Sequence, residues 1–363
     1  MWLRWIILFI CWSLCLFSCE TDDLLQAPSL SQRDSIADAW IELGRHLFYD
    51  RRLSLNNDRS CGICHEQAKG FTDGFVRAVG TTEAIHPRNT ISLINVNTRR
   101  SLGWIDQQQS HLESQLLIPL LGNQPVEMGA SEILLSRLSD MNTDATYQDL
   151  LQNLDLTQLT IAHLSKAIAS FERTILSHQS PYDQYLDGQV EALSVAAKRG
   201  LILFTEVLPC QNCHGGKEFD QPSLDVSSQY GRRHAWYNTG LYHIGDGRYP
   251  EGREGVYELT GLMSDIGLYR VPTLRNLAFT GPYYHDGSGA SIEDVLINYN
   301  AGGRVTISGP YVGDGRQHPN KHQFIRPLGL SDAELKDLKA FLLALSDESI
   351  VNQSRLSDPW PRD

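Results

Sequence analysis

The sequence has few cysteines, and none of them is left over for a structural disulfide. There are seven in 363 residues, and three of these fall within the first nineteen. The other four form two closely spaced pairs, Cys61 with Cys64 and Cys210 with Cys213. This usage excludes a small secreted fold held together by disulfides, and a hydrophobic content of 41% is sufficient for a packed core instead.

Positive charge is also scarce. Lys and Arg number 31 against 43 Asp and Glu, which gives a formal net charge of -12 and an isoelectric point of about 5.4. Nucleic acids and anionic membrane surfaces attract basic proteins, so this balance argues against both as partners. An acidic surface instead suits a basic redox partner.

Long hydrophobic runs are missing except near the N-terminus. An apolar run from Trp5 to Phe17, which follows Arg4, is 13 residues long and too short to span a bilayer comfortably. It ends at Leu-Phe-Ser-Cys19 and acidic residues follow, a pattern that resembles the signal peptide of a bacterial lipoprotein. We therefore expect a signal peptide over residues 1–19, a lipid anchor at Cys19, a tether over 20–35 and a periplasmic location. An ordinary signal peptide that leaves a soluble periplasmic protein, or an uncleaved anchor, stays open.

Two Cys-x-x-Cys-His motifs are the most informative feature that the sequence does contain. One runs from Cys61 to His65 and the other from Cys210 to His214. In this pattern two thiols attach covalently to a haem, and the adjacent His supplies a nitrogen to its iron. A thioredoxin-like redox pair or a zinc site made from the two Cys pairs is the alternative, but neither requires a His after the second Cys. We expect two covalently bound haem c groups with His65 and His214 as iron ligands.

The segments around the two motifs repeat weakly. Gly44 opens the segment Gly-Arg-His-Leu-Phe before the first motif, and Gly200 opens Gly-Leu-Ile-Leu-Phe before the second. An aromatic residue follows each motif, Phe71 in one case and Phe219 in the other. The repeat predicts two cytochrome c-like domains.

Amphipathic periodicity predicts a mainly α-helical fold with long loops. The predicted helices cover residues 36–48, 131–151, 157–177, 190–205 and 331–345. Ser331 and Glu334 form a capping box at the start of the last helix. Two segments rich in Gly and Tyr, 221–262 and 301–326, are expected to be loops that cover the haem faces.

The domain boundary is expected at Ser180 and Pro181, where a proline interrupts the helical pattern. The first haem domain would then cover residues 36–180 and the second 181–350. Residues 351–363 would form a short tail.

Three stretches carry a resemblance to a known family: Leu43–His65, Pro125–Gly129 and Val271–Gly287. In content and order they resemble the bacterial di-haem cytochrome c peroxidases, including the relatives that mature methylamine dehydrogenase by oxidising tryptophans. The resemblance spans about residues 40–345. It implies two mainly helical cytochrome c-like domains, with peroxide cleaved at the first haem and electrons entering at the second.

The resemblance implies an oxidoreductase that reduces hydrogen peroxide to water. Its partners would be a small electron-donor cytochrome or cupredoxin and, as an open alternative, a second copy of the chain in a homodimer. Two other functions stay open: a side-chain-oxidising enzyme of the methylamine dehydrogenase-maturing type, and a di-haem electron carrier without turnover.

Two catalytic residues are carried over from the family pattern. Glu127 matches the glutamate that moves protons above the first haem, a task that general acid–base chemistry requires for peroxide cleavage. Trp104 lies near the family's inter-haem tryptophan and is expected to relay electrons. Without the resemblance, Glu127 would be a solvated carboxylate near a helix start and Trp104 a core residue.

The first haem departs from the usual pattern. Typical members carry a His in the loop after the first motif, which ligates the iron and must leave on activation. Here Thr81 occupies that position and His86 lies further along the loop. We expect an open distal face that needs no reductive unblocking, with ligation by His86 as the alternative.

The second haem departs as well. Where peroxidases of the family use Met as the sixth ligand, Tyr299 occurs, as in the methylamine dehydrogenase-maturing relatives. A tyrosinate ligand stabilises ferric iron and lowers the haem potential. A five-coordinate iron, or ligation by Met263, is the alternative.

The family also binds a calcium ion between its domains. Asn89, Thr280 and Pro282 match its ligands, an Asn side chain and two backbone carbonyls, which are oxygen donors that calcium accepts. Arg88, Arg270 and Arg275 are candidates for contacts with haem propionates, and His285 is expected near a haem.

Overall fold

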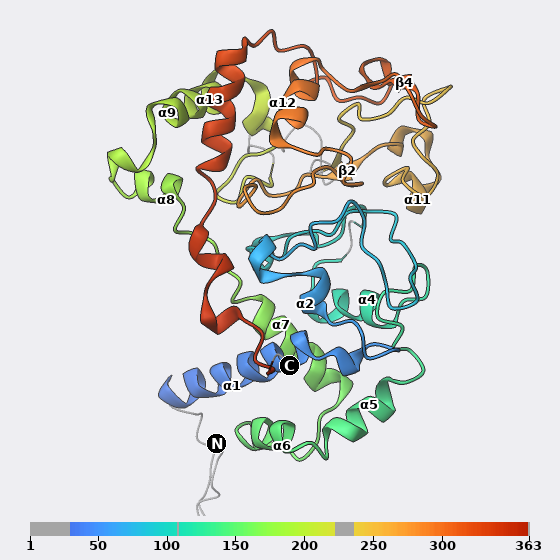
Figure 1. The fold of residues 1–363 in the computed structure, drawn as a ribbon, viewed down its shortest axis with the longest axis vertical. Coiled ribbons are helices and arrows are strands. Elements are labelled where there is room, and N and C mark those ends of the chain that lie inside the picture. The colour runs from blue at the N-terminus through green and yellow to red at the C-terminus, as the bar shows by residue number, and fades with distance from the viewer. Residues whose placement is uncertain (1–29, 107–108, 222–235, 362–363) are drawn as a thin grey trace, which may run out of the picture.

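The computed structural model describes residues 30–106, 109–221 and 236–361, which form a lower and an upper lobe in Figure 1. The helices of the lower lobe are α1 (Leu30–Tyr49), α2 (Cys61–Cys64), α3 (Leu112–Gln115), α4 (Leu117–Leu121), α5 (Leu134–Met141), α6 (Ala145–Gln152) and α7 (Ile161–Glu172). The helices described in the upper lobe are α8 (Pro181–Leu186), α9 (Val195–Ile202), α11 (Tyr257–Thr260), α12 (Ile292–Asn300) and α13 (Asp332–Leu343). Short strands of the upper lobe pair antiparallel, β1 (Trp236–Tyr237) with β2 (Tyr269–Arg270) and β3 (Val305–Thr306) with β4 (Gly313–Asp314).

Each lobe is built on one close helix crossing, and a glycine makes each crossing possible. A Cβ atom on Gly44 of α1 would lie 1.9 Å from the carbonyl oxygen of Ala167 in α7. A Cβ atom on Gly200 of α9 would lie 2.0 Å from the carbonyl oxygen of Asp337 in α13. Only glycine permits such an approach of two backbones. The repeat seen in the sequence therefore corresponds to the same packing in both lobes.

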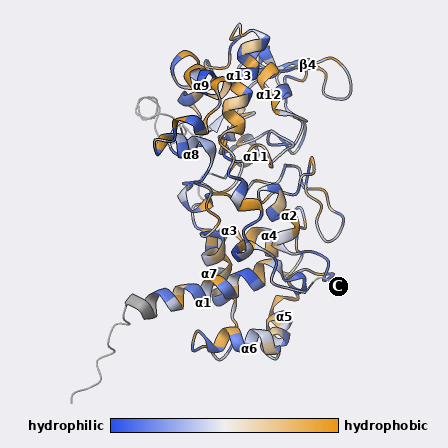
Figure 2. Cartoon of the chain, turned by 60° about the vertical axis from the view of Figure 1, so that its left-hand side comes forward, coloured by the Kyte–Doolittle hydropathy of each residue, from blue (hydrophilic) through white to orange (hydrophobic). Residues whose placement is uncertain are grey.

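Two phenylalanines follow each crossing and form the centre of the core. The rings of Phe48 and Phe171 lie 5.1 Å apart in the lower lobe, and those of Phe204 and Phe341 lie 5.3 Å apart in the upper lobe. All four side chains are buried. Figure 2 shows apolar and polar residues alternating along most helices, as expected for helices that bury one face.

The predicted helix over residues 131–151 is wrong in one respect, because the structure has two helices there. α5 ends at Met141 and α6 begins at Ala145. Between them Asp144 is extended, and its side chain accepts hydrogen bonds from the backbone N–H groups of Thr146 at 2.9 Å and Tyr147 at 3.4 Å. This side chain caps a new helix instead of continuing the old one.

The other predicted helices are confirmed with shifted ends. α1 begins already at Leu30, α7 and α9 are shorter than expected, and the capping box of Ser331 and Glu334 at the start of α13 is present. Of the segment 221–262, residues 222–235 lie outside the described ranges, as do residues 1–29 with Cys19. No helix in the described part of the chain is long and apolar enough to cross a membrane.

The end of the chain returns to the lower lobe. Ile350 and Leu356 are fully buried in its core, and Trp360 Nε1 donates to the carbonyl of His46 at 3.0 Å. In Figure 1 this red segment runs down from α13 to lie near α1. The last residues therefore connect the two lobes in addition to the direct connection at Ser180, which caps α8 with a capping box.

Candidate functional site: two haem attachment sites

The two iron-ligand candidates are held in the same way. His65 Nδ1 lies 3.0 Å from the carbonyl oxygen of Phe71, and His214 Nδ1 lies 3.0 Å from that of Phe219. A carbonyl can only accept, so each Nδ1 carries the proton and each Nε2 keeps its lone pair for a metal. Both phenylalanines have positive φ, 59° and 55°, which turns their carbonyls back toward the imidazoles. The aromatic residue noted after each motif thus has a defined role.

The four cysteines of the motifs are free thiols in the structure. One pair lies on α2 in the lower lobe, and the other lies in the 3-10 turn Pro209–Asn212 and just after it in the upper lobe. Burial raises the pKa of Cys64 and Cys213 to about 12, so the thiols stay protonated until they react. No group of three or more His, Cys, Asp or Glu residues that could hold a metal occurs within the described ranges. The two cysteine pairs lie in different lobes, which disfavours a zinc site shared by them.

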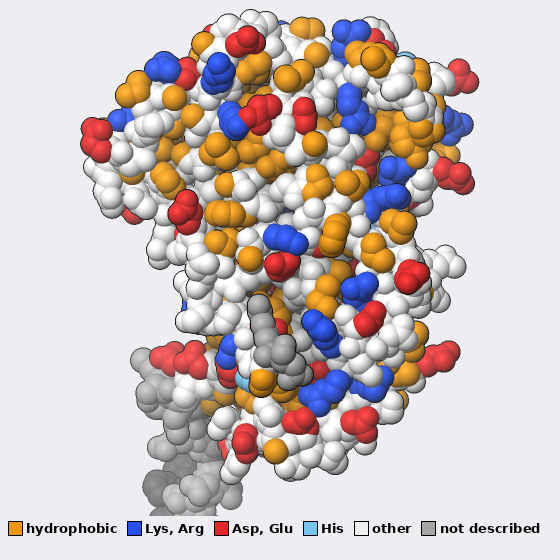
Figure 3. Space-filling view, in the orientation of Figure 1, with side chains coloured by type: hydrophobic (Ala, Val, Ile, Leu, Met, Phe, Trp, Pro, Cys, Tyr) orange, Lys and Arg blue, Asp and Glu red, His pale blue; other side chains and the backbone are white. Residues whose placement is uncertain are grey.

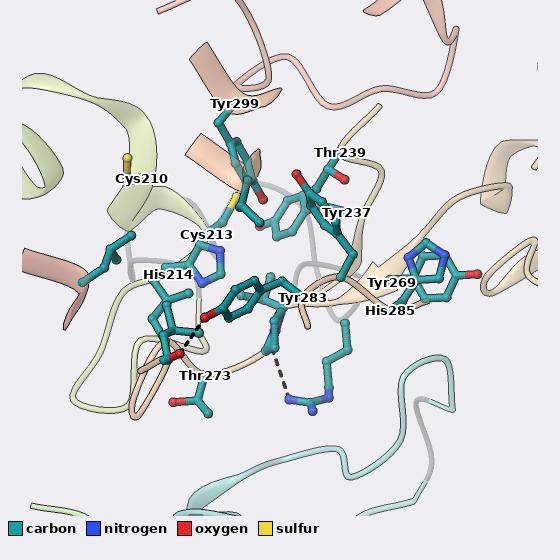
Figure 4. Close-up of a pocket in the computed structure, with 18 of the residues that line it drawn as sticks. Cys210, Cys213, His214, Tyr237, Thr239, Tyr269, Thr273, Tyr283, His285 and Tyr299 are labelled. Atoms are coloured by element: carbon teal, nitrogen blue, oxygen red, sulfur yellow. Dashed lines mark hydrogen bonds between the residues drawn. The ribbon is translucent and has the colours of Figure 1, made fainter. Parts of the chain in front are cut away.

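A cavity of about 250 Å³ adjoins the second motif. Cys210, Cys213 and His214 border it, and its other walls are largely apolar or aromatic. Tyr299, on α12, also borders it, and Figure 4 shows this side chain directed toward Cys213. Burial raises the pKa of Tyr299 above its usual value, so its phenolate would form only beside a compensating cation such as iron. Met263, the alternative ligand, is 52% exposed and is not among the residues that border the cavity.

The walls of this cavity fit a porphyrin that carries polar substituents. Arg270 Nη2 and His285 Nε2 are buried beside it, and neither has a hydrogen-bond partner among the described residues. Buried polar atoms without a partner are rare in folded proteins, and a bound group with carboxylates and a metal would account for them. His285 stacks on Tyr269 with ring centroids 3.5 Å apart, as Figure 4 shows.

Sequence reasoning missed how many tyrosines surround the second motif. Besides Tyr299, five tyrosines border the cavity: Tyr237, Tyr249, Tyr269, Tyr283 and Tyr284. Tyr237 and Tyr249 come from the segment 221–262, which was expected to be a loop over a haem. Tyr269, Tyr283 and Tyr284 lie outside both segments rich in Gly and Tyr. That composition was the available signal for the first two, but it did not indicate which side chains turn inward.

Glu127 lies in the lower lobe, close to His86, the alternative ligand of the first iron. Its Oε1 lies 3.8 Å from His86 Nε2. Burial raises the pKa of the Glu127 carboxyl to about 7. A carboxyl group with such a pKa can both accept and donate a proton near neutral pH.

The loop that carries His in typical relatives is fixed differently here. Thr81 is buried, and its Oγ1 donates to Asp58 Oδ1 at 2.5 Å. His86 Nδ1 lies 3.0 Å from the backbone nitrogen and 3.2 Å from the carbonyl oxygen of Arg88, and its Nε2 faces Glu127. Ligation of an iron by His86 would require this arrangement to open.

Trp104 lies between the lobes. Its Nε1 donates to the carbonyl of Asn89 at 2.8 Å, and its own carbonyl accepts the backbone N–H of Arg270 at 2.9 Å. The indole meets Tyr269 edge-on, with ring centroids 6.5 Å apart. Trp104 also borders the cavity beside the second motif.

The three calcium-ligand candidates, Asn89, Thr280 and Pro282, all border the same cavity. Asn89 Nδ2 donates to the carbonyl of Phe75 at 2.8 Å, which leaves its Oδ1 as the atom able to ligate a cation. The backbone N–H of Asn89 donates to the carbonyl of His285 at 2.7 Å. The three candidates therefore border a cavity to which both lobes contribute residues.

The three arginines proposed for propionates differ in their partners. Arg88 pairs with Glu258 across the lobes. Arg275 is held by Asp183 at 2.9 and 3.0 Å and lies 3.1 Å from Glu218. Arg270 is buried without a carboxylate pair, and burial lowers its pKa to about 9.

The two lobes have matching helix crossings, and each bears a Cys-x-x-Cys-His motif with the same histidine anchor. This arrangement is that of a c-type haem protein. The model of the di-haem cytochrome c peroxidase family matches residues 38–191. A curated relative, the methylamine utilization protein MauG of Methylorubrum extorquens, is 30% identical over 85% of this chain and 78% of its own length. The cytochrome-c peroxidase IdrP1 of Denitromonas iodatirespirans is 31% identical over 84% of this chain and 81% of its own length. The chain therefore belongs to the di-haem cytochrome c peroxidase family.

A solved structure supports this assignment. The crystal structure of a MauG-like protein associated with microbial copper homeostasis is 38% identical, with a TM-score of 0.83, and the match covers 89% of this chain and 94% of that one. Family membership implies two haem c groups. It also places the chain among oxidoreductases and not among simple electron carriers.

Proposed function

We propose that the protein reduces hydrogen peroxide to water with electrons from a small cytochrome c or cupredoxin. Peroxide would be cleaved at the first haem, and electrons would enter at the second. The observation that carries this proposal is the Glu127 carboxyl, which lies in the same lobe as His65 and 3.8 Å from His86 Nε2, and whose pKa burial raises to about 7. An electron carrier has no use for such a group, whereas peroxide cleavage requires one.

The position of Glu127 in the lobe of the first haem suggests the roles of the protein's own residues. Haem, when bound, supplies an iron that binds peroxide and takes part in electron transfer. Glu127 would take a proton from one peroxide oxygen and return it to the other, which would leave as water. His86 Nε2 lies 3.8 Å from Glu127 Oε1, beside the carboxyl that would move the proton.

We further propose that Trp104 carries electrons between the haems and that Tyr299 is the sixth ligand of the second iron. The position of Trp104 between the lobes, with a hydrogen bond to one and a backbone contact to the other, supports the relay. The place of Tyr299 in the wall of the cavity beside the second motif supports its ligation of the second iron.

A second candidate function is oxidation of protein side chains. Tyr299 favours it, because a tyrosinate ligand lowers the haem potential and makes the second haem a poor reductive store. The relatives named MauG and MauG-like agree with this alternative.

One experiment separates the two functions. The haem-loaded protein is mixed with hydrogen peroxide and reduced cytochrome c, and the oxidation of the donor and the spectra of both haems are recorded. Rapid, repeated donor oxidation supports the peroxidase. A long-lived oxidised protein that consumes peroxide but leaves the donor reduced supports side-chain oxidation.

We also propose a calcium ion at Asn89, Thr280 and Pro282. These residues border one cavity at the contact between the lobes, and neutral oxygens with waters suit calcium. Removal of calcium with a chelator is expected to weaken the coupling of the two haems, which redox titration measures.

The location we propose is the periplasmic side of a bacterial membrane, with a lipid anchor at Cys19. Haem attachment to Cys-x-x-Cys-His motifs and the apolar run before Cys19 support export. On the face shown in Figure 3, acidic and basic side chains are interspersed, so a donor would meet no field of one sign there.

A further inference from the structure

Aromatic rings form a continuous series that begins at Trp104 and leads away from the inter-haem contact. Trp104 meets Tyr269 at 6.5 Å between ring centroids, and Tyr269 stacks on His285 at 3.5 Å. His285 lies 6.3 Å from Tyr249, which meets Tyr242 at 5.4 Å. Each separation is within the range of direct aromatic contact. Because electron tunnelling falls off exponentially with distance, such a series offers short steps where one long step would be slow.

The series ends at the surface. Tyr242 meets Tyr311 at 5.8 Å, and Tyr311, which is half-buried, receives a hydrogen bond from Arg253 at 2.6 Å. Tyr269, Tyr249 and Tyr242 belong to one buried cluster of the upper lobe, against which Trp104 packs.

Tyr242 differs from the other tyrosines of the series because its hydroxyl contacts a carboxylate that can accept its proton. Its hydroxyl donates to Asp286 Oδ2 at 2.5 Å, and both residues are buried. Burial alone would raise the pKa of Asp286, but hydrogen bonds from Ser288 and Tyr242 and the charge of Arg304 outweigh it and keep the pKa below its usual value. Asp286 is therefore an ionised base in contact with a neutral phenol.

The other tyrosines lack such a base. The Tyr249 hydroxyl donates to the amide oxygen of Asn238 at 2.9 Å, a neutral group that cannot take up a proton. The Tyr269 hydroxyl is buried without a hydrogen-bond partner among the described residues.

Two arginine side chains disfavour an oxidised Tyr242 that keeps its hydroxyl proton. The guanidinium of Arg304 lies over the Tyr242 ring at 4.3 Å, and that of Arg253 lies over the Tyr311 ring at 5.0 Å and 3.8 Å from Asp286 Oδ2. A positive charge above a ring disfavours a further positive charge on it. An oxidised Tyr242 is stable in this field only as the neutral radical.

We propose that Tyr242, with Asp286 as its proton acceptor, is a redox-active tyrosine that stores an oxidising equivalent drawn from the haems through Trp104, Tyr269 and Tyr249. The proposal rests on the proposed function, which supplies the oxidant, hydrogen peroxide. In the step, Tyr242 gives one electron to the oxidised haem centre. The phenol O–H bond breaks and its proton passes to Asp286, which leaves a neutral phenoxyl radical beside an aspartic acid. Return of one electron from a donor, with the same proton, restores the phenol.

The test uses the holoprotein with both haems. One equivalent of hydrogen peroxide is added without a donor, the sample is frozen rapidly, and its electron paramagnetic resonance spectrum is recorded with ordinary and with ring-deuterated tyrosine. We expect a radical signal that narrows on deuteration. Tyr242→Phe and Asp286→Asn are both expected to lose most of it.

Tyr147→Phe is the matched control. Tyr147 is buried in the lower lobe and donates to Asp50 Oδ2 at 2.8 Å, so it has the same phenol–carboxylate chemistry without a place in the series. It should retain the signal. The haem absorption spectrum and thermal melting of each variant show whether it has folded.

The outcomes separate the inference from the proposed function. A wild-type protein that consumes peroxide without a tyrosyl signal, or a Tyr242→Phe variant that keeps the signal at full yield, overturns the inference alone. A wild-type protein that does not react with peroxide overturns the proposed function. The three variants are then oxidised with photogenerated ruthenium(III) tris-bipyridine, where loss of the signal in Tyr242→Phe but not in Tyr147→Phe supports the inference and equal signals overturn it.

Discussion

The two lobes hold their haem attachment sites with the same scaffold and surround them with different chemistry. Each has a glycine at its helix crossing and an imidazole anchored at 3.0 Å to a phenylalanine carbonyl. The lower lobe then provides a carboxyl group, Glu127, with a histidine beside it. The upper lobe instead provides a ring of tyrosines. A duplicated scaffold therefore fixes where the cofactors attach, and the loops outside the repeat decide what each can do.

The largest expected effect comes from removing the acid of the lower lobe. Glu127→Gln should lower peroxide turnover by about 10²–10⁴-fold, the usual contribution of a general acid–base group. Stopped-flow measurement of peroxide consumption at equal haem content checks this. Because burial raises the pKa of Glu127 to about 7, the ionised fraction and the wild-type rate should both rise as pH passes through that value, and the variant should lack this step.

Glu132→Gln is the control for that prediction. Glu132 lies five residues along the same segment and is exposed, so its variant should turn over at the wild-type rate. If Glu127→Gln turned over peroxide at the wild-type rate, the lower lobe would not owe its proposed catalytic role to Glu127.

The next effect concerns the tyrosines of the upper lobe. Tyr299→Met should raise the potential of the second haem by on the order of 0.1 V or more, since axial ligands move haem potentials over about 0.8 V. Spectroelectrochemical titration of each haem measures it. Tyr283→Phe is the control, because Tyr283 borders the same cavity while its hydroxyl donates to the carbonyl of Leu277 at 2.7 Å. Equal potentials in wild type and Tyr299→Met would show that Tyr299 is not a ligand.

The shared scaffold can be tested lobe by lobe. Gly44→Ala and Gly200→Ala would each place a Cβ about 2 Å from a carbonyl oxygen and should lower the free energy of unfolding by about 1–3 kcal/mol. Each should also disturb the spectrum of its own haem and not of the other. Denaturant unfolding followed at both haems measures this, and Gly103→Ala, whose Cβ would meet its nearest neighbour at 3.7 Å, should change little. If either variant lost the signals of both haems together, the two helix crossings would not act independently.

The repeat and the motifs were predictable because they are local. A Cys-x-x-Cys-His motif and the capping box at Ser331 depend on neighbours in the sequence. The break at Asp144 was not predicted, because a single side chain competes there with an otherwise continuous apolar pattern. Tyr242 and Asp286 are distant in sequence and meet only through the folding of long loops. Such pairings leave no periodic signal, so the tyrosine series could not be seen before the structure.

The smallest expected effect lies at one position where the two scaffolds differ. Phe171 and Phe341 both pack on the crossing glycine of their lobe, and the residues that follow them are Glu172 and Leu342. Glu172 is 7% exposed, and burial raises its pKa to about 8 from an ordinary value near 4.5. Burial therefore favours the protonated form in the folded state, and the stability this form provides is full below about pH 4.5 and lost as pH rises through about 8.

Wild-type protein should accordingly become less stable between pH 5 and pH 8, and Glu172→Gln, which cannot ionise, should reduce that fall by about 3–4 kcal/mol. Urea unfolding at several pH values measures the difference. Glu132→Gln is the control, because Glu132 is an exposed residue of the same lobe. If the pH dependence of Glu172→Gln equals that of wild type, the carboxyl is solvated or paired when haem is bound.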